Sequence, residues 1–148
     1  MAARKKKLVG ATKPRLQNTP LKGANKLQDV LDLAELIKMP LMPWQEHVLR
    51  DALTVDKDGN WIRKTNLILV ARQNGKTHLT RMLILAHLLK WDSKNIIIAS
   101  SNRAMALDTF RQVAQVFEGN ENLMALVKAI RYANGTESIE MKDGRRLD

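Results

Sequence analysis

Apolar positions recur along this chain at two spacings, one typical of helices and one typical of buried strands. Residues 28–38 place their apolar side chains on one helical stripe. Residues 43–53 repeat that pattern, and Pro43 suits the first turn of a helix. Residues 78–89 are apolar nearly all round, so we expect this third helix to be buried on most sides.

Two short runs lack any polar alternation and flank the third helix. Residues 67–70 read Leu-Ile-Leu-Val, and residues 95–99 read Asn-Ile-Ile-Ile-Ala. Such runs suit parallel strands buried on both faces, and strand, helix and strand of this length form a right-handed βαβ unit. A further helix should start after Ser101 or Asn102, either of which can cap it, and end at Gly119. We therefore predict an α/β fold with a parallel core.

The last part of the chain has a different pattern. We expect a short helix over residues 121–130, followed by three β-prone segments separated by Asn134-Gly135 and Asp143-Gly144. Both dipeptides favour tight hairpin turns, so the sequence predicts a C-terminal antiparallel β-meander. Asp58-Gly59 predicts another tight turn further upstream.

Charge is distributed unevenly along the 148 residues. Residues 1–28 hold eight of the 25 basic residues and none of the 15 acidic residues, within a net charge of +10. We predict a basic disordered arm over residues 1–27 and a domain over residues 28–148. The arm either contacts the phosphates of DNA or RNA or serves as a solubilising leader. The chain has no Cys, and residues 82–89, its longest apolar stretch, are too short to span a bilayer.

The segment between the run at 67–70 and the helix at 78–89 carries the strongest chemical signal. It reads Ala-Arg-Gln-Asn-Gly-Lys-Thr and ends at Thr77. A strand, a tight loop with Gly-Lys-Thr and a helix are the context of a phosphate-binding loop. Helix-start amides attract anions, Lys76 would reach the outer phosphates, and Thr77 would offer its hydroxyl to Mg²⁺. Val70 stands where the usual pattern has its first glycine, and a coincidental turn is the alternative.

This loop resembles the deviant Walker A motif of the large terminase subunits of tailed bacteriophages, the ATP-driven motors that package viral DNA. Their loop lacks the first glycine and carries an arginine where this chain has Arg72. The resemblance extends upstream to residues 42–45 and downstream to residues 99–102, and it covers about residues 30–148. It implies a P-loop NTPase core of the RecA-like type that binds ATP and Mg²⁺.

The resemblance also implies roles for individual residues. The nucleotide contacts would come from Gln45, Arg72, Gln73, Asn74, Gly75, Lys76, Thr77 and His78. Lys76 and Arg72 would be catalytic, with Arg72 stabilising transition-state charge, and Thr77 would be the metal ligand. A structural salt bridge is the alternative for Arg72. Gln45 would read the adenine edge or be an ordinary surface glutamine, while Trp44 would stack near the base or anchor the core.

In the family, the partners are double-stranded DNA, the small terminase subunit and the capsid portal, and the location is the host cytoplasm at the procapsid. The apolar strand ending in Asp-Glu, which supplies the catalytic carboxylates there, does not follow residue 98 here, and neither does the nuclease domain. We therefore expect an incomplete ATPase domain whose own hydrolytic activity is uncertain.

Two other functions remain open from the sequence. A helicase-like ATPase acting on nucleic acid would share the glutamine and the loop, although its loop more often keeps the first glycine. A non-catalytic nucleotide-binding or DNA-binding polypeptide would need only the phosphate loop and the basic arm.

Overall fold

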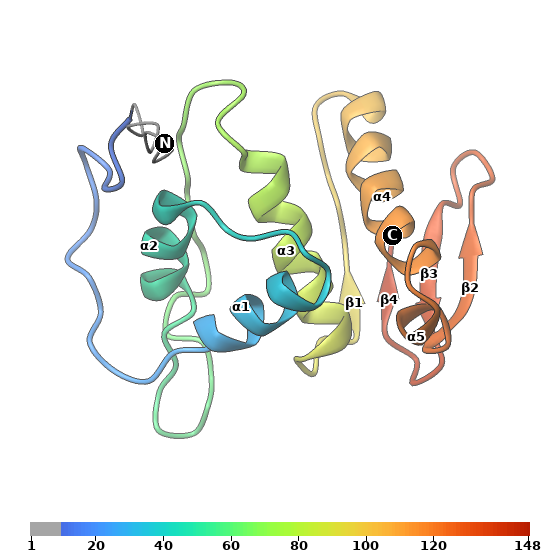
Figure 1. Cartoon of the computed structure of the whole chain (residues 1–148), viewed down its shortest axis with the longest axis horizontal. Coiled ribbons are helices and arrows are strands. Elements are labelled where there is room, and N and C mark those ends of the chain that lie inside the picture. The colour runs from blue at the N-terminus through green and yellow to red at the C-terminus, as the bar shows by residue number, and fades with distance from the viewer. Residues whose placement is uncertain (1–9) are drawn as a thin grey trace, which may run out of the picture. The chain divides into compact units, whose positions relative to one another are not determined.

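A computed structural model describes residues 10–148 (Figure 1). The helices are α1 (Leu27–Leu36), α2 (Pro43–Ala52), α3 (Lys76–Leu89), α4 (Arg103–Glu118) and α5 (Glu121–Met124). The strands are β1 (Asn95–Ile96), β2 (Val127–Arg131), β3 (Ser138–Met141) and β4 (Arg146–Leu147). The chain divides into a first unit, residues 10–28 and Leu41–Leu67, and a second unit, Asp29–Pro40 and Ile68–Asp148. No helix in the described range is long and apolar enough to cross a membrane.

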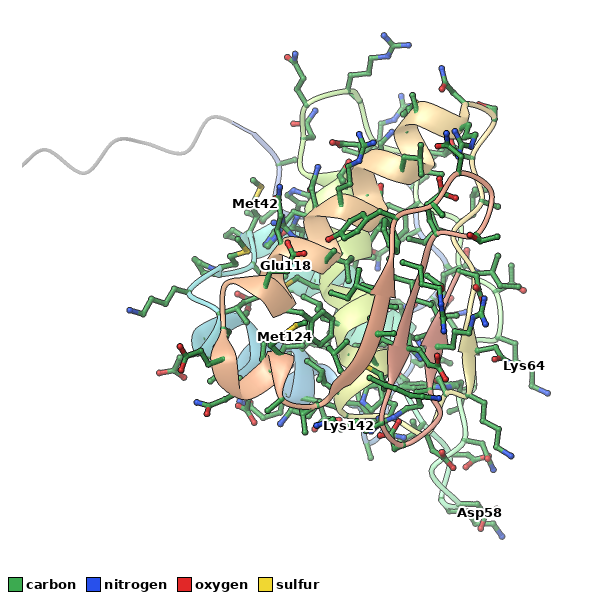
Figure 2. All side chains as sticks on the ribbon, turned by 90° about the vertical axis from the view of Figure 1, so that its right-hand side faces the viewer. Met42, Asp58, Lys64, Glu118, Met124 and Lys142 are labelled. Atoms are coloured by element: carbon green, nitrogen blue, oxygen red, sulfur yellow. The ribbon has the colours of Figure 1, made fainter. Side chains whose placement is uncertain are left out.

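The first unit is built around α2. Pro43 occupies the first turn as predicted, and Leu49 is fully buried on the inner face. The predicted turn at Asp58-Gly59 is confirmed, because Val55 and Trp61 pair in antiparallel fashion and Gly59 has a φ of 81°. That left-handed backbone favours glycine. Figure 2 shows Asp58 projecting outward at the tip of this turn.

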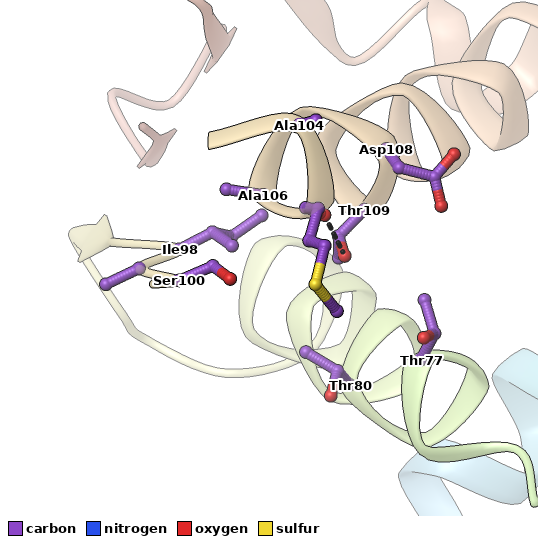
Figure 3. Close-up of a pocket in the computed structure, with 10 residues that line it drawn as sticks. Thr77, Thr80, Ile98, Ser100, Ala104, Ala106, Asp108 and Thr109 are labelled. Carbon is purple, nitrogen blue, oxygen red and sulfur yellow. Dashed lines mark hydrogen bonds between the residues drawn. The ribbon is translucent and has the colours of Figure 1, made fainter. Parts of the chain in front are cut away.

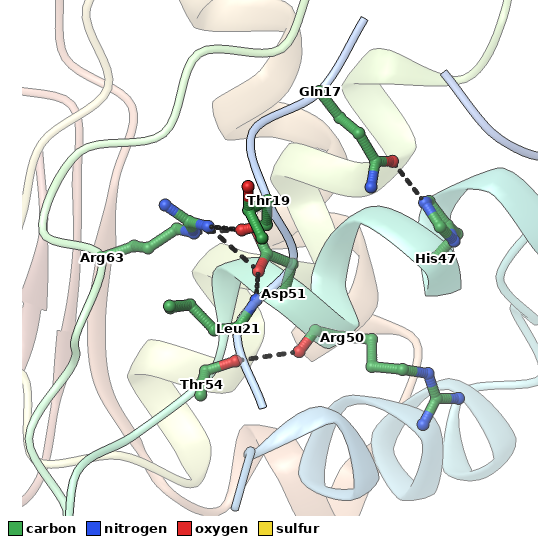
Figure 4. Close-up of polar contacts among 8 residues, drawn as sticks. All are labelled: Gln17, Thr19, Leu21, His47, Arg50, Asp51, Thr54 and Arg63. Atoms are coloured by element: carbon green, nitrogen blue, oxygen red, sulfur yellow. Dashed lines mark hydrogen bonds and ion pairs between the residues drawn. The ribbon is translucent and has the colours of Figure 1, made fainter. Parts of the chain in front are cut away.

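The described part of the basic arm has no helix or strand over residues 10–24, but it is attached to α2. The Leu21 amide donates a 2.6 Å hydrogen bond to Asp51 Oδ1, and Gln17 Oε1 lies 2.8 Å from His47 Nε2. Arg63 donates both to Asp51, at 2.7 Å from Nε, and to the Thr19 carbonyl, at 2.9 Å (Figure 4). Residues 10–28 belong to the first unit, and residues 1–9 of the predicted arm lie outside the described residues.

The core of the second unit lies between α3 and its neighbours. As its pattern predicted, α3 is buried on several sides, and Met82, Leu85 and Leu88 have no exposed surface. It packs against α4, whose buried residues include Phe117. Trp91, just beyond the end of α3, donates a 2.7 Å hydrogen bond from its indole to Asp29 of α1.

The sheet of the second unit has the order β1-β4-β3-β2. The antiparallel pairs β2–β3 and β3–β4 confirm the predicted meander, with Gly135 and Gly144 at positive φ in its two turns. The preceding helix α5 ends at Met124, earlier than predicted, because the following residues pair with β3 from Val127 onward. The parallel pair is β1 with β4, in which Ile96 faces Leu147.

The predicted strand at residues 67–70 is wrong, and the second predicted strand is shortened. Residues 67–70 form no strand, and the Leu67 and Leu69 side chains are 84% and 87% exposed. In place of a strand over 95–99 buried on both faces, β1 has two residues and Ile97 is 77% exposed. A strand needs neighbours for its backbone groups, and the described residues give none to 67–70. The fold is thus mixed α/β with a small four-stranded mixed sheet, and the predicted βαβ core is not confirmed.

Candidate phosphate-binding site

The Gly-Lys-Thr segment forms a tight loop that leads directly into α3. Gly75 is the residue before the helix, with φ of 84°, and Gln73 is also left-handed, with φ of 62°. Backbone that alternates in this way turns successive amides toward one concave side, an arrangement that suits anions. The Asn74 side-chain amide closes the loop by donating to the carbonyls of Ala71 and Arg72 at 3.3 and 3.1 Å. The Asn74 side chain therefore stabilises the conformation of the loop.

Lys76 bridges the two ends of this loop. Its ammonium donates a 2.9 Å hydrogen bond to the Val70 carbonyl, although the side chain belongs to the first residue of α3. The amides of the first helical turn have no intrahelical acceptor, and the helix dipole adds positive potential there. Lys76 and Thr77 are both exposed. A cationic side chain and a helix start thus converge on one accessible position.

Arg72 and Gln73 are both exposed. Within residues 10–148, Arg72 has no carboxylate at ion-pair distance, so the predicted alternative of a structural salt bridge is not observed. The catalytic role of Arg72 stays a prediction.

Both ring nitrogens of His78 are hydrogen-bonded to neighbouring protein groups. Arg81 can only donate, so Nδ1 of His78 accepts the 2.9 Å bond from Arg81 Nη2. The proton is then on Nε2, which donates to the Pro40 carbonyl at 3.2 Å. Burial, and secondarily the charge of Arg81, lower the pKa of His78, which keeps the ring neutral near pH 7. A nucleotide contact by His78 would therefore use its backbone amide.

Gln45 is buried, so its interpretation as a surface residue is wrong. Its Oε1 accepts a 2.7 Å hydrogen bond from the Met42 amide, which satisfies a donor at the start of α2. Gln45 and the half-buried Trp44 belong to the first unit, whereas the loop belongs to the second. Adenine recognition by Gln45 stays a prediction.

A cavity of about 460 Å³ lies beside the loop, between α3 and α4 (Figure 3). Its lining consists of Thr77, Thr80, Ile98, Ala99, Ser100, Ala104, Met105, Ala106, Asp108 and Thr109. The hydroxyls of Thr80 and Thr109 donate to carbonyls one turn earlier, of Lys76 and Met105. Because Thr77 is part of this lining, the cavity is continuous with the helix start.

Sequence reasoning had singled out residues 100–102 at one end of this cavity. Asn102 is the cap of α4, since its Oδ1 accepts a 2.8 Å hydrogen bond from the Ala104 amide. Ser100 in turn accepts from the Asn102 amide at 3.3 Å. Capping of α4 by Asn102 is confirmed. Asp108 was not identified, although it lies on the polar face of a helix beginning at this motif.

The available donors fit a nucleotide carrying Mg²⁺. The described residues contain no cluster of three His, Cys, Asp or Glu side chains. Mg²⁺ bound to nucleotides uses one or two protein oxygens together with phosphate oxygens and waters. The exposed hydroxyl of Thr77 is such an oxygen, and it adjoins Lys76 at the helix start.

Comparisons with protein-family models, with curated proteins and with solved structures found no match.

Proposed function

We propose that residues 71–77 bind the phosphates of ATP, and that this chain is the ATP-binding segment of a phage terminase large subunit. The observation that carries the proposal is the hydrogen bond from Lys76 Nζ to the Val70 carbonyl across a loop ending in left-handed Gly75. This contact holds the Lys76 ammonium across the loop that precedes α3. Phosphate oxygens can replace the carbonyl as its acceptor.

Each residue of the loop then has a distinct part. Lys76 would neutralise the outer phosphates, and the amides of the first turn of α3 would donate hydrogen bonds to them. Thr77 supplies a metal ligand, and bound Mg²⁺ would supply neutralisation of phosphate charge. Arg72, exposed and without an acidic partner in the described range, can reach charge that develops on a transferred phosphoryl group.

A RecA-like P-loop core is also part of the proposal. Residues 67–70, which form no strand in the structure, and residues 97–98 beyond β1 would join a larger sheet in it. The apolar and exposed side chains of Leu67, Leu69 and Ile97 support this, because they suit burial in a sheet with further strands.

Double-stranded DNA is the proposed partner of the basic arm. Eight basic residues without an acidic one occupy residues 1–28, which favours sequence-independent contact with phosphates. In the complete protein, ATP hydrolysis would drive DNA into the capsid, with the small subunit and the portal as further partners in the host cytoplasm. These partners come from the family resemblance.

Binding of a fluorescent ATP analogue, followed by anisotropy, tests the proposal. Lys76→Ala should reduce affinity at least tenfold, a loss of about 1.4 kcal/mol, as expected for a charged hydrogen bond to phosphate. Lys90→Ala removes the same charge from an exposed position just beyond the same helix and should have little effect. Equal affinity in Lys76→Ala, or equal losses in both variants, would refute the proposal.

A measurement of ATP hydrolysis distinguishes an ATPase from a non-catalytic nucleotide-binding polypeptide. No carboxylate is identified that orients the attacking water, so phosphate release by this chain should match that of Lys76→Ala. Steady turnover that depends on Lys76 would contradict this expectation. Nucleotide binding without turnover leaves the chain itself as an ATP-binding module.

A further inference from the structure

A chain of hydrogen bonds connects the loop after α1 to side chains of α3 and then of α4. The Pro40 carbonyl accepts from His78, and His78 accepts from Arg81, as described above. Arg81 Nη1 then donates to Gln112 Oε1 at 3.3 Å, and Gln112 Nε2 donates to Asp108 Oδ2 at 2.7 Å. The series fixes the orientation of Gln112, because its oxygen faces Arg81 and its nitrogen therefore faces Asp108.

Asp108 is the end of this series that reaches the cavity beside the phosphate loop. It is the only carboxylate in the cavity lining, whose other polar side chains are hydroxyls. Asp108 and Thr77 come from facing helices and lie at the same end of the cavity (Figure 3). Gln112 occupies Oδ2, and no hydrogen bond within residues 10–148 uses Oδ1. One carboxylate oxygen of this cavity-lining residue is thus available as an acceptor.

A carboxylate in this position has opposite effects on a bare nucleotide and on its magnesium complex. Phosphate and carboxylate are both anionic, so Asp108 repels a metal-free triphosphate. Waters in the shell of Mg²⁺ donate hydrogen bonds and carry positive potential, so Asp108 attracts the complex. Whether Asp108 raises or lowers the affinity for the nucleotide therefore shows whether hydrated Mg²⁺ lies between Asp108 and the phosphates.

We propose that Asp108 is an outer-shell acidic residue of the magnesium site, accepting a hydrogen bond from metal-bound water across the cavity from Thr77. Gln112 and Arg81 are positioning residues that hold its carboxylate. The proposal rests on ATP binding by the loop. It assigns the acidic contribution to α4, a helix on which sequence reasoning had placed none.

The test is titration of the intact chain with fluorescent ATP in Mg²⁺ and in EDTA. In Asp108→Asn, the gain in affinity that Mg²⁺ produces should fall about tenfold, the usual size for removing an outer-shell partner of a metal. Affinity in EDTA should stay equal or rise, since a repulsive charge has been removed. Asp92→Asn is the matched control, because Asp92 is exposed, carries the same charge and lies outside the cavity lining. Gln112→Leu should lower the Mg²⁺ gain less than Asp108→Asn does.

The possible results distinguish a failure of the Asp108 proposal from a failure of ATP binding by the loop. Loss of binding in Lys76→Ala together with an unchanged Mg²⁺ gain in Asp108→Asn would overturn the role of Asp108 alone. Equal weakening of Asp108→Asn in Mg²⁺ and in EDTA would also overturn it, because that pattern indicates structural damage. Binding that is insensitive to Lys76→Ala would instead remove the nucleotide site itself.

Discussion

Replacing Asp51 should release the basic arm from the first unit. The Asp51 carboxylate joins three segments that are distant in sequence: the arm at Leu21, α2 itself, and the segment after the turn at Arg63. Arg63 also donates a hydrogen bond to the Thr19 carbonyl, so the arm is attached at both Thr19 and Leu21 (Figure 4). Asp51→Ala removes the common acceptor of these contacts.

The size of the effect follows from the three hydrogen bonds that Asp51 accepts, at 2.6, 2.7 and 3.2 Å. Bonds to charged groups contribute about 1.5–3 kcal/mol when well shielded. The Asp51 and Arg63 side chains are 29% and 20% exposed, so solvent screens part of the ion pair. We estimate a loss of about 2 kcal/mol for attachment of the arm, which corresponds to about a 30-fold larger open population.

Site-resolved trypsin cleavage measures that population. When opening and closing are fast, the cleavage rate follows the equilibrium fraction of the open form. Cleavage after Lys22 should therefore accelerate about 30-fold in Asp51→Ala by the same free-energy estimate. Asp58→Ala is the control, because Asp58 is exposed at the tip of a turn and carries the same charge. Unchanged cleavage after Lys22, or the same acceleration in both variants, would refute the attachment of the arm through Asp51.

Three further predictions concern charge, backbone and pH. Deleting residues 1–16 removes six basic residues but keeps the contacts from Gln17 onward, so the salt dependence of duplex binding, log K against log salt, should flatten by up to about 5; an unchanged slope in mobility-shift assays would place the DNA contacts elsewhere. Gly75→Val forces a β-branched side chain into left-handed backbone at φ of 84°, and should abolish nucleotide binding in a protein that circular dichroism shows to be folded. Unfolding in urea should show that stability declines as pH falls below 6.5, because the pKa of His78 is lowered in the fold and the unfolded chain takes up the proton first; His78→Gln should reduce this decline, and an identical pH profile would contradict it.

Local signals were sufficient for both ends of α4, for the start of α2 and for the turns, but not for the end of α5. Pro43 and Asn102 mark where α2 and α4 begin, and Gly119 marks where α4 ends, because each acts through its own backbone or neighbouring amides. The positive φ of Gly135 and Gly144 likewise follows from turn chemistry that involves only adjacent residues. These features do not depend on distant parts of the chain.

Strands and the cavity depend on distant parts of the chain, and sequence reasoning failed there. The apolar run at residues 67–70 has strand composition, yet its state is decided by whether another strand lies beside it. The parallel pairing of β1 with β4 joins residues about fifty positions apart and leaves no local pattern. Asp108 resembles any exposed carboxylate on a helix until α3 and Thr77 are seen across the cavity.

The central claim is that residues 71–77 bind nucleotide phosphates, and a backbone amide chemical-shift titration of the 16.8 kDa chain tests it most directly. With ATP and Mg²⁺, the account predicts that Gly75, Lys76 and Thr77 shift most, that ADP gives a similar pattern, and that adenosine shifts none of them. Lys76→Ala should weaken the response throughout. Shifts confined to the basic residues of the first unit, with the amides of residues 73–78 unchanged, would indicate unspecific anion binding and contradict the account.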